Sequence, residues 1–477
     1  MRRSELLVAA AACGALVTLG LACSDSSQGV AGFEDTPDAA NDVSSVPSET
    51  SEPPSDVSDA GDAGADVSTP ENYDPSDEPV VCGSGPCAQR LAAGDRHVCA
   101  LMADGTIRCW GDNTKGAVGL AATDAGDGSG PPVSADLVTG IVPRVVAAIT
   151  SATQISAGDD VTCTRLADGT VQCWGANNTG QLGLSSVTPK SDALAHPAPS
   201  TVDITAPAVR VDVGHGSVCA KLATGELSCW GTNAQKQLLT GSAAAVGGPA
   251  VAAVGALDLL RTTSSNTTIY GVTANGQLFS WGMVSGRDTS FVLDGAPREN
   301  VSLSDVVDVA VGPSLVDNTG MATFHACAIA KARVYCWGST LKTELPALCT
   351  GVPNDRKVPT LAPVQRSPSG GFAFPQQIAA GRLSTCVRLT DGTVQCCGDD
   401  TRGQMGTGSL ADPPAVLSLT PAKALQGYAV QVVTTRYSTC ALLRDGSVAC
   451  WGGNRYGELG QGTVDVAPHA TPVKVAF

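Results

Sequence analysis

The cysteines are the residues of this chain best suited to chemistry, because 12 of its 18 fall into six evenly spaced pairs. The pairs are Cys99 with Cys109, Cys163 with Cys173, Cys219 with Cys229, Cys327 with Cys336, Cys386 with Cys396, and Cys440 with Cys450. Such cysteines could form disulfides or bind a metal. Zinc sites need close Cys-x2-Cys-like groups, which a single ten-residue spacing does not supply. The spacing therefore favours disulfides, and we expect no metal and no cofactor.

A β-hairpin is the element that would hold each pair together. In residues 99–110, CALMADGTIRCW, an Asp-Gly step separates two short apolar segments, which is a strong hairpin signal. A three-residue loop at 103–105 pairs Met102 with Thr106 and places the two cysteines opposite each other. Directly opposed residues on antiparallel strands are close enough for a disulfide. Each bond would close a loop of about ten residues and stabilise the fold by roughly 2–3 kcal/mol.

Two copies of the motif depart from this pattern in informative ways. One lacks Asp-Gly, but a two-residue loop at 331–332 still sets its cysteines opposite each other. Another has lost both cysteines together and carries Tyr270 and Ser280 in their places. Unpaired cysteines would be expected to vary singly, so the joint loss supports six disulfides within the hairpins.

The hairpin motif returns seven times, with starts 51 to 64 residues apart, and a Trp-Gly step follows it in six copies. All the tryptophans of the chain occupy this position: Trp110, Trp174, Trp230, Trp281, Trp337 and Trp451. The sixth copy has Cys397 there instead. A position that repeats identically inside a strand motif indicates packing between repeats, and a ligand platform is the less favoured interpretation.

Five of the other six cysteines can be assigned to three further roles, and the sixth, Cys13, lies in the N-terminal segment that is interpreted below as a signal peptide. Cys82 and Cys87 bracket a Gly-Ser-Gly-Pro loop and are candidates for a small disulfide. Cys349 and Cys397 remain, and their bond would fix the 339–375 insertion to the sixth repeat. Cys23 is the candidate lipidation site.

The N-terminus has the features of an export signal. Two arginines precede an apolar run, and a small residue precedes Cys23, as in bacterial lipoprotein signals. We therefore predict a signal peptide at 1–22 and a lipid anchor on Cys23. Ordinary signal cleavage and an uncleaved anchor are the alternatives. Ser24 after the cysteine favours the outer membrane or cell surface, and a periplasmic or secreted protein is the alternative location.

Charge divides the chain into an acidic tether and a near-neutral domain. The net charge is −16, yet residues 24–80 hold 15 acids and no Lys or Arg. Residues 81–477 hold 29 acids and 27 bases, a balance of −2. We predict that 23–80 is a disordered tether, because it has too few apolar residues to offset its ordering entropy. A near-neutral domain lacks the basic field that nucleic-acid binding needs.

Further parts of each repeat carry a family resemblance. An apolar strand ends in Ala-Gly before the hairpin at 91–94, 155–158 and 378–381. After Trp-Gly comes an Asn and a Gly-x-Leu-Gly turn, as at 177–183 and 454–460. Together these closely resemble the repeat of the regulator of chromosome condensation family. That resemblance implies an all-β fold, a seven-bladed β-propeller over residues 81–477.

Two expectations about the propeller concern its ends and its surface. The last segment, 471–477, resembles an outer strand and would complete a blade with N-terminal strands. Insertions between the repeats would form the binding surface, since functional residues concentrate in loops on rigid scaffolds. These are 121–150, 184–207, 239–264, 283–322 and 339–375.

The sequence offers no strong catalytic signal, so we predict no enzyme. Among five histidines, His97 and His325 share one repeat position, which indicates a structural hydrogen bond. The family is known for guanine nucleotide exchange on a nuclear GTPase, a function that an exported protein would not perform. The favoured function is a non-catalytic, envelope-tethered binding module for an envelope or extracellular protein. A glycan-binding or carbohydrate-active propeller and a structural spacer are the alternatives.

Overall fold

The computed structural model describes residues 73–74, 76, 78–120, 139–184, 191–239, 246–252, 257–284, 287, 292–313, 315–316, 322–339, 348–352, 356–366 and 373–477. The predicted signal peptide, Cys23 and most of the predicted tether lie outside these residues. In the described part, no helix is long and apolar enough to cross a membrane.

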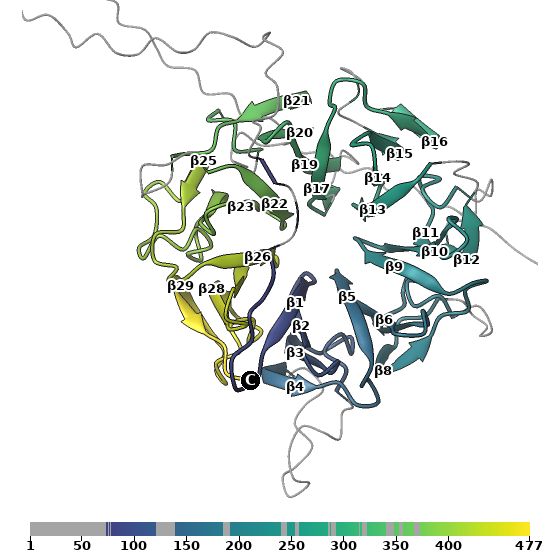
Figure 1. The fold of residues 1–477 in the computed structure, drawn as a ribbon, viewed down its shortest axis with the longest axis horizontal. Helices are drawn as coiled ribbons and strands as arrows, with labels where there is room; N and C mark the ends of the chain where they lie inside the picture. The colour runs from purple at the N-terminus through teal and green to yellow at the C-terminus, as the bar shows by residue number, and fades with distance from the viewer. Residues whose placement is uncertain are drawn as a thin grey trace, which may run out of the picture. The chain divides into compact units, whose positions relative to one another are not determined.

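The described strands form seven antiparallel sheets that surround a central axis, as predicted (Figure 1). Blade one contains β1 (Ala88–Ala93), β2 (His97–Met102), β3 (Ile107–Asp112) and β4 (Thr139–Val145). Blade two contains β5 (Ala152–Gly158), β6 (Val161–Leu166), β7 (Val171–Ala176) and β8 (Ala195–Thr201). Blade three contains β9 (Ala208–Val213), β10 (Ser217–Leu222), β11 (Leu227–Thr232) and β12 (Val246–Ala252). Blade four contains β13 (Leu259–Ser264), β14 (Thr268–Thr273), β15 (Leu278–Val284) and β16 (Val292–Glu299).

The remaining three blades follow the same order from the axis outward. Blade five contains β17 (Val306–Val311), β19 (Ala322–Ala330), β20 (Arg333–Ser339) and β21 (Arg356–Ala362), with the short β18 (Leu315–Val316) paired to β19. Blade six contains β22 (Pro375–Ala380), β23 (Ser384–Leu389), β24 (Val394–Asp399) and β25 (Ala415–Pro421). Blade seven contains β26 (Ala429–Thr434), β27 (Ser438–Leu443), β28 (Val448–Asn454) and β29 (Asp465–Lys474).

The predicted hairpin register is confirmed. Cys99 lies opposite Cys109, and the Met102 N–H donates to the Thr106 carbonyl at 2.9 Å. In blade five, Cys327 lies opposite Cys336 across a tight two-residue turn. Both turn residues there have positive φ, which a two-residue hairpin loop requires.

The glycine of Trp-Gly is required by a close backbone approach. Gly111 has a φ of 110°, and a Cβ built on it would lie 2.4 Å from the Arg96 carbonyl oxygen. In every copy, the backbone at this glycine lies similarly close to the turn that precedes the second strand. A β-bulge at the tryptophan, between Cys109 and Gly111 in blade one, accompanies this close approach. A side chain cannot be accommodated at this position.

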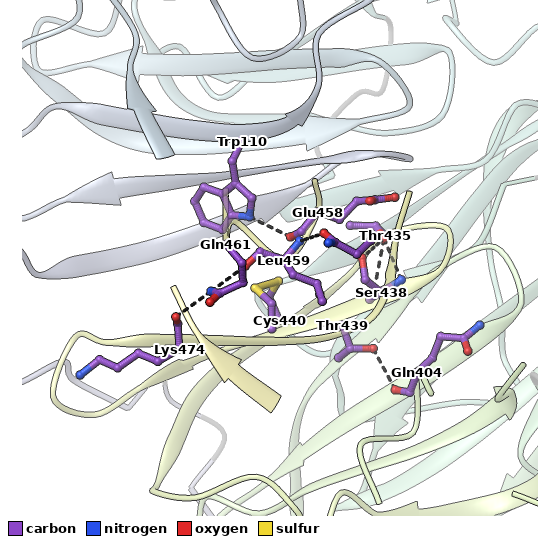
Figure 2. Close-up of a disulfide and its surroundings, with 12 residues drawn as sticks. Trp110, Gln404, Thr435, Ser438, Thr439, Cys440, Glu458, Leu459, Gln461 and Lys474 are labelled. Carbon is purple, nitrogen blue, oxygen red and sulfur yellow. Dashed lines mark hydrogen bonds between the residues drawn. A yellow bond between two sulfur atoms is a disulfide. The ribbon is translucent and has the colours of Figure 1, made fainter. Parts of the chain in front are cut away.

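The hydrophobic core lies between blades. Among the described residues, seven buried clusters each join two neighbouring blades. Each tryptophan is fully buried in one of them, and in five its Nε1–H donates to a backbone carbonyl of the preceding blade. Figure 2 shows the bond that closes the ring, from Trp110 of blade one to the Glu458 carbonyl of blade seven at 2.8 Å.

Two irregular copies preserve this interface by other means. In blade four, Tyr270 replaces the first cysteine, and the Trp337 Nε1–H donates to its hydroxyl at 3.2 Å. In blade six, Cys397 stands in the tryptophan position and is bonded to Cys349 of blade five. That disulfide lies in the buried cluster between the two blades, so a covalent link replaces the tryptophan.

Glutamine side chains join the innermost strands, which otherwise diverge from one another. The Gln431 Nε2 donates to the Leu91 carbonyl at 2.9 Å, and its Oε1 accepts the Leu91 N–H at 2.8 Å. Gln154 and Gln377 make the same pair of bonds to the next blade. We call these contacts glutamine bridges.

The prediction that the C-terminal segment completes a blade with N-terminal strands is wrong. Residues 471–474 belong to β29, which completes a blade made only of β26–β29, and every other blade is likewise contiguous in sequence. The ring closes through side chains of blades seven and one, with no shared strand. No swapped strand is needed, because the glutamine bridge of Gln431, the Trp110 bond and a shared core already join these blades.

The outer strand of each blade contains proline, as in Pro143 of β4 and Pro468 of β29. Because proline cannot donate to another strand, it protects an exposed sheet edge from pairing with other chains. The predicted insertions contain five of these outer strands, so they are partly regular structure: 121–150 includes β4, and 184–207 includes β8.

Candidate functional site

The two faces of the propeller differ. The turns between first and second strands, such as 94–96, lie on one face with the connections from third to fourth strands; we call it the loop face. The Asp-Gly turns, such as 103–105, lie on the opposite face, which we call the hairpin face. The described residues before β1 cross the hairpin face, where the Val81 N–H donates to the Arg444 carbonyl and the Tyr73 hydroxyl to the Pro375 carbonyl (Figure 1).

The central channel has a volume of about 380 Å³ and polar walls. One position of each innermost strand supplies a ring of side chains: Arg90, Gln154, Arg210, Arg261, Asp308, Gln377 and Gln431. The three glutamines form the bridges between blades. Asp308 accepts the Ile378 N–H at 2.9 Å and also binds the Arg261 guanidinium at 2.8 Å. Most of this wall therefore serves the ring itself.

The mouth of the channel on the loop face is more varied. In six of the seven blades, the residue four positions before the first hairpin cysteine or its equivalent is polar or charged: Asp95, Asp159, His215, Asn266, Arg382 and Arg436. Of these, Asp95, His215, Arg382 and Arg436 line the mouth. Several of these turns are joined backbone to backbone, as where the Arg436 N–H donates to the Asp95 carbonyl at 2.8 Å. The scaffold is thus rigid while the side chains differ from blade to blade.

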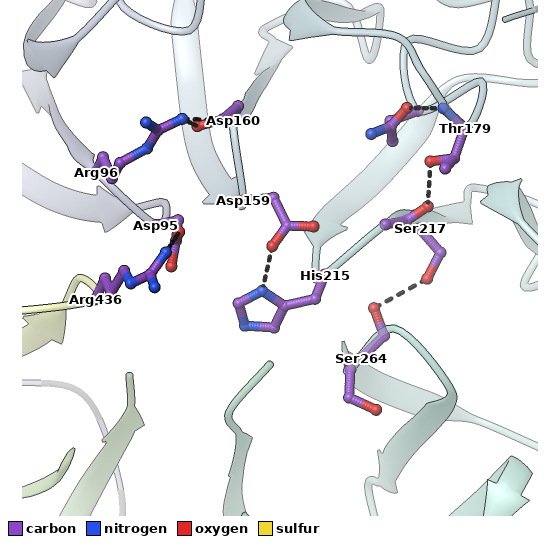
Figure 3. Close-up of polar contacts among 12 residues, drawn as sticks. Asp95, Arg96, Asp159, Asp160, Thr179, His215, Ser217, Ser264 and Arg436 are labelled. Atoms are coloured by element: carbon purple, nitrogen blue, oxygen red, sulfur yellow. Dashed lines mark hydrogen bonds and ion pairs between the residues drawn. The ribbon is translucent and has the colours of Figure 1, made fainter. Parts of the chain in front are cut away.

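Blades one to three form an acidic, internally paired sector of this mouth. Figure 3 shows the His215 Nδ1 at 2.6 Å from an Asp159 carboxylate oxygen and the Arg96 guanidinium 3.2 Å from both oxygens of Asp160. Arg96 also binds Asp112 at 2.7 Å. Burial raises the pKa of Asp160. Burial alone would favour neutral His215, but the Asp159 carboxylate raises the pKa of that imidazole.

Blades six and seven form a basic sector. Burial, and then the neighbouring Arg436 charge, lower the pKa of Arg382. Arg436 lies 3.6 Å from an Asp95 oxygen, and its guanidinium stacks 5.1 Å from the centre of the Tyr437 ring. Burial, and then the charge of Asp159, raise the pKa of Asp95.

A second pocket adjoins the mouth between blades six and seven. Its volume is about 460 Å³, and its lining includes Leu383, Arg402, Tyr437, Arg455, Glu458 and Val466. The turns of blades six and seven form the wall between the two cavities. Arg382 and Arg436 line the mouth, while the residues that follow them, Leu383 and Tyr437, line the pocket.

Glu458, in the wall of this pocket, is almost fully buried, and burial raises its pKa to about 7. Its Oε2 accepts the Tyr456 N–H at 2.7 Å. Three other blades have glutamine at this position: Gln181, Gln237 and Gln404. In each, the side-chain oxygen accepts the equivalent backbone N–H bond, and the side-chain nitrogen donates a second bond to a neighbouring oxygen. An ionised glutamate can make only the accepting bond.

The residues singled out from the sequence lie mainly in the framework. Disulfides join all six hairpin pairs and also Cys82 with Cys87 and Cys349 with Cys397. The hairpin disulfides and tryptophans are buried between blades, away from both cavities. His97 is fully buried, and its Nε2 lies 2.8 Å from the Thr162 hydroxyl. Within the described ranges, no cluster of His, Cys, Asp and Glu is arranged to hold a metal ion.

The mouth residues were not predicted as a site, although the sequence contains a signal for them. An alignment of the copies shows one turn position that varies from acid to base while the residue before it stays small. Asp95, Asp159 and Arg382 follow a glycine in the same motif. Variation at one position of a repeated turn marks side chains that the fold does not fix.

Comparison with known proteins agrees with this architecture. The family model described as "Regulator of chromosome condensation (RCC1) repeat" matches residues 89–117, 152–181, 376–404 and 429–458. Four segments of the chain therefore match the RCC1 repeat. The matched segments fall in blades one, two, six and seven.

Two curated relatives share the RCC1-repeat region at low identity. Protein pim1 of Schizosaccharomyces pombe is 24% identical over 412 residues, which cover 82% of this chain and 64% of pim1. The E3 ubiquitin-protein ligase HERC2 of Homo sapiens is 24% identical over 310 residues, covering 64% of this chain and 6% of HERC2. The chain thus spans less than two thirds of either relative.

Solved structures show the same fold. A chain in the crystal structure of Kap60 bound to yeast RCC1 (Prp20) superposes with a TM-score of 0.60 and 14% identity, covering 87% of this chain and 91% of that one. Human WBSCR16 superposes with a TM-score of 0.58 and 18% identity, covering 74% of this chain and 86% of that one. Both similarities concern the propeller fold alone.

Proposed function

We propose that this chain is an exported, non-catalytic binding protein whose propeller presents its loop face to a protein partner in the cell envelope or outside the cell. In this proposal residues 1–22 are a signal peptide, Cys23 carries a lipid, 23–80 are a tether, and 81–477 are the binding domain. The lipid would be the only contact with a membrane.

The asymmetry of the two faces is the observation that carries this proposal. Side chains that vary between blades, the channel mouth and the adjoining pocket all lie on the loop face. The hairpin face of blades six, seven and one is partly covered by the chain that leads into β1, through Val81 and Glu78. A tether that arrives on the hairpin face leaves the loop face open for a partner.

The disulfides support an exported location. Eight disulfides join described cysteines, and such bonds persist in oxidising compartments outside the cytosol. The relatives named above do not transfer their activities, because the chain spans only part of them. Yeast RCC1 (Prp20) is bound to another protein, Kap60, in its crystal structure, which is a precedent for protein binding by a protein that contains this fold.

The glycan-binding alternative receives less support from the geometry. Carbohydrate sites commonly use exposed aromatic rings, and all six tryptophans are fully buried. The tyrosines at the loop face, Tyr437 and Tyr456, are instead stacked against guanidinium groups.

Site-specific photocrosslinking in the source cells tests the proposal. A photoreactive amino acid would replace Thr401, exposed on the loop face, or Asp168, exposed on the hairpin face, in the full-length chain. We expect Thr401 to yield an adduct with one protein, identified by mass spectrometry, and Asp168 to yield none. Thr401 adducts that are absent, or that match those from Asp168, would contradict the proposal, provided both variants reach wild-type levels of disulfide-bonded protein.

A further inference from the structure

Arginine and tyrosine gather at one part of the loop face, on blades six and seven. We define the arginine–tyrosine patch as Arg382, Arg402, Arg436, Tyr437, Arg455 and Tyr456. Two of the six tyrosines of the chain lie here. Arginine and tyrosine are enriched at the centres of protein interfaces, where they contribute more binding free energy than other residues.

Most guanidinium groups of the patch lack a carboxylate. Among the described residues, none lies within ion-pair distance of Arg382, Arg402 or Arg455. The Arg402 guanidinium donates to the Val466 carbonyl at 2.8 Å, and the Arg455 guanidinium lies 5.9 Å from the centre of the Tyr456 ring.

Several arginines elsewhere in the ring are paired with carboxylates. Arg210 with Asp212 and Arg261 with Asp308 are examples within the channel, and Arg96 binds two carboxylates. Arg382, Arg402 and Arg455 differ from these paired arginines, because no carboxylate of the described residues lies within ion-pair distance of them.

The patch also has a shape that a protruding segment could enter. Arg382 and Arg436 line the channel mouth, whereas Arg402, Arg455 and Tyr437 line the neighbouring pocket of about 460 Å³. The pocket also contains two apolar side chains, Leu383 and Val466, and three acidic ones, Asp399, Glu458 and Asp465. The carboxylates of Asp399 and Asp465 already form hydrogen bonds with neighbouring residues of the chain. A carboxylate-bearing segment could place its acid among the guanidinium groups and an apolar neighbour against Tyr437 and Leu383.

From these observations we infer that the arginine–tyrosine patch binds an acidic segment of a protein partner through its carboxylates. This inference rests on the proposed function and specifies the surface and the chemistry of the partner. Guanidinium groups bind carboxylates in planar, two-point geometry, and half-buried cations gain more from pairing than fully solvated ones. The acidic sector on blades one to three would repel a segment docked in the opposite orientation and so fix its direction.

Binding of a labelled acidic peptide tests the inference with the full-length, disulfide-bonded chain. Fluorescein-labelled hexaglutamate is the probe, and labelled hexaglutamine is its uncharged control, both followed by fluorescence anisotropy. We expect hexaglutamate to bind at least about tenfold more tightly than hexaglutamine at low salt, with a difference that shrinks as salt rises. Equal binding of the two peptides would overturn the inference.

A charge-reversal variant locates the binding. Arg382→Glu combined with Arg402→Glu should weaken hexaglutamate binding at least about tenfold. Arg144→Glu is the matched control, because Arg144 is exposed on outer strand β4 of blade one. Equal loss in Arg144→Glu, or no loss in the double variant while thermal unfolding shows both folded, would overturn the inference.

Binding of the crosslinked partner to the double variant distinguishes a failure of this inference from a failure of the proposed function. If that protein binds the Arg382→Glu and Arg402→Glu variant as tightly as the wild type, the binding function stands and the assigned patch is wrong. If no loop-face adduct forms, the proposed function fails, whatever the peptide result.

Discussion

Replacement of Glu458 by glutamine should stabilise the propeller, and the gain should depend on pH. Blades two, three and six already have glutamine at this position, so the surrounding backbone accommodates the amide. The variant would keep the accepted bond from the Tyr456 N–H, which is 2.7 Å long in the wild type. The amide would also remove the cost of ionising a buried carboxyl.

The magnitude follows from the two pKa values. Burial raises the pKa of Glu458 from 4.5 to about 7. Below 4.5 the carboxyl is protonated in both the folded and the unfolded chain, so it imposes no pH-dependent cost. Between 4.5 and 7 the unfolded chain releases a proton that the folded chain retains, so the wild type loses stability as pH rises. The full difference above the folded pKa amounts to roughly 3 kcal/mol.

Guanidinium unfolding of wild type and Glu458→Gln at a series of pH values measures this difference. We expect similar free energies of unfolding near pH 4, and an advantage for the variant that grows to roughly 3 kcal/mol by about pH 8. Gln404→Glu is the reciprocal variant and should lose stability over the same range. A variant advantage that is independent of pH, or a less stable Glu458→Gln at every pH, would refute the reasoning.

Four further perturbations test the framework. Gln431→Ala removes the glutamine bridge that closes the ring and should lower the free energy of unfolding by roughly 1–3 kcal/mol in denaturant titrations, and an unchanged midpoint would contradict its role. Burial lowers the pKa of His97 and His325 to about 4, so stability should fall as pH drops from about 6.5 to about 4, because the unfolded chain then binds protons that the folded chain excludes. His97→Gln should reduce that acid loss by up to about 3 kcal/mol, and an unaltered pH profile would argue against it. Cys349→Ser opens a loop with a sequence separation of 48 and should lower the free energy of unfolding by about 4 kcal/mol on the chain-entropy account. The thermal midpoint measures this loss, and a midpoint equal to that of the wild type would contradict the prediction. Gly111→Ala should prevent accumulation of folded protein, because its Cβ would meet a carbonyl 2.4 Å away; normal yield with intact disulfides would show that the turn can move.

Local sequence was sufficient to predict the hairpins and their pairing. The Asp-Gly turn and a fixed spacing determine that Cys99 faces Cys109, since register in a tight hairpin depends only on loop length. The number of repeats likewise predicted the number of blades. These features depend on residues close together in the chain, which one sequence displays directly.

Contacts between blades could not be predicted in this way. The role of Gln431 depends on Leu91 at the other end of the chain, and nothing local in either segment indicates the match. Cys397 was recognised as a departure from the repeat, but only the fold shows that its disulfide occupies the tryptophan position between two blades. The expectation of a shared closing strand failed because these side-chain contacts suffice to close the ring.

The site was the least predictable part. The arginine–tyrosine patch is assembled from turns of two blades, and only the ring geometry brings Arg382 beside Arg436. Attention to the insertions missed these turns, because a three-residue turn inside a regular repeat carries no length signal. A position-by-position comparison of the repeats would have revealed that one turn position is acidic in blades one and two and basic in blades six and seven.

Hydrogen–deuterium exchange of the full-length chain, with and without the partner identified by crosslinking, tests the central claim most directly. The account predicts new protection at the loop-face turns of blades six and seven, 381–383, 400–404, 435–437 and 455–458. The hairpin-face turns 103–106 and 167–170 should exchange as before. Protection confined to the hairpin face would contradict the claim that this propeller binds through its loop face.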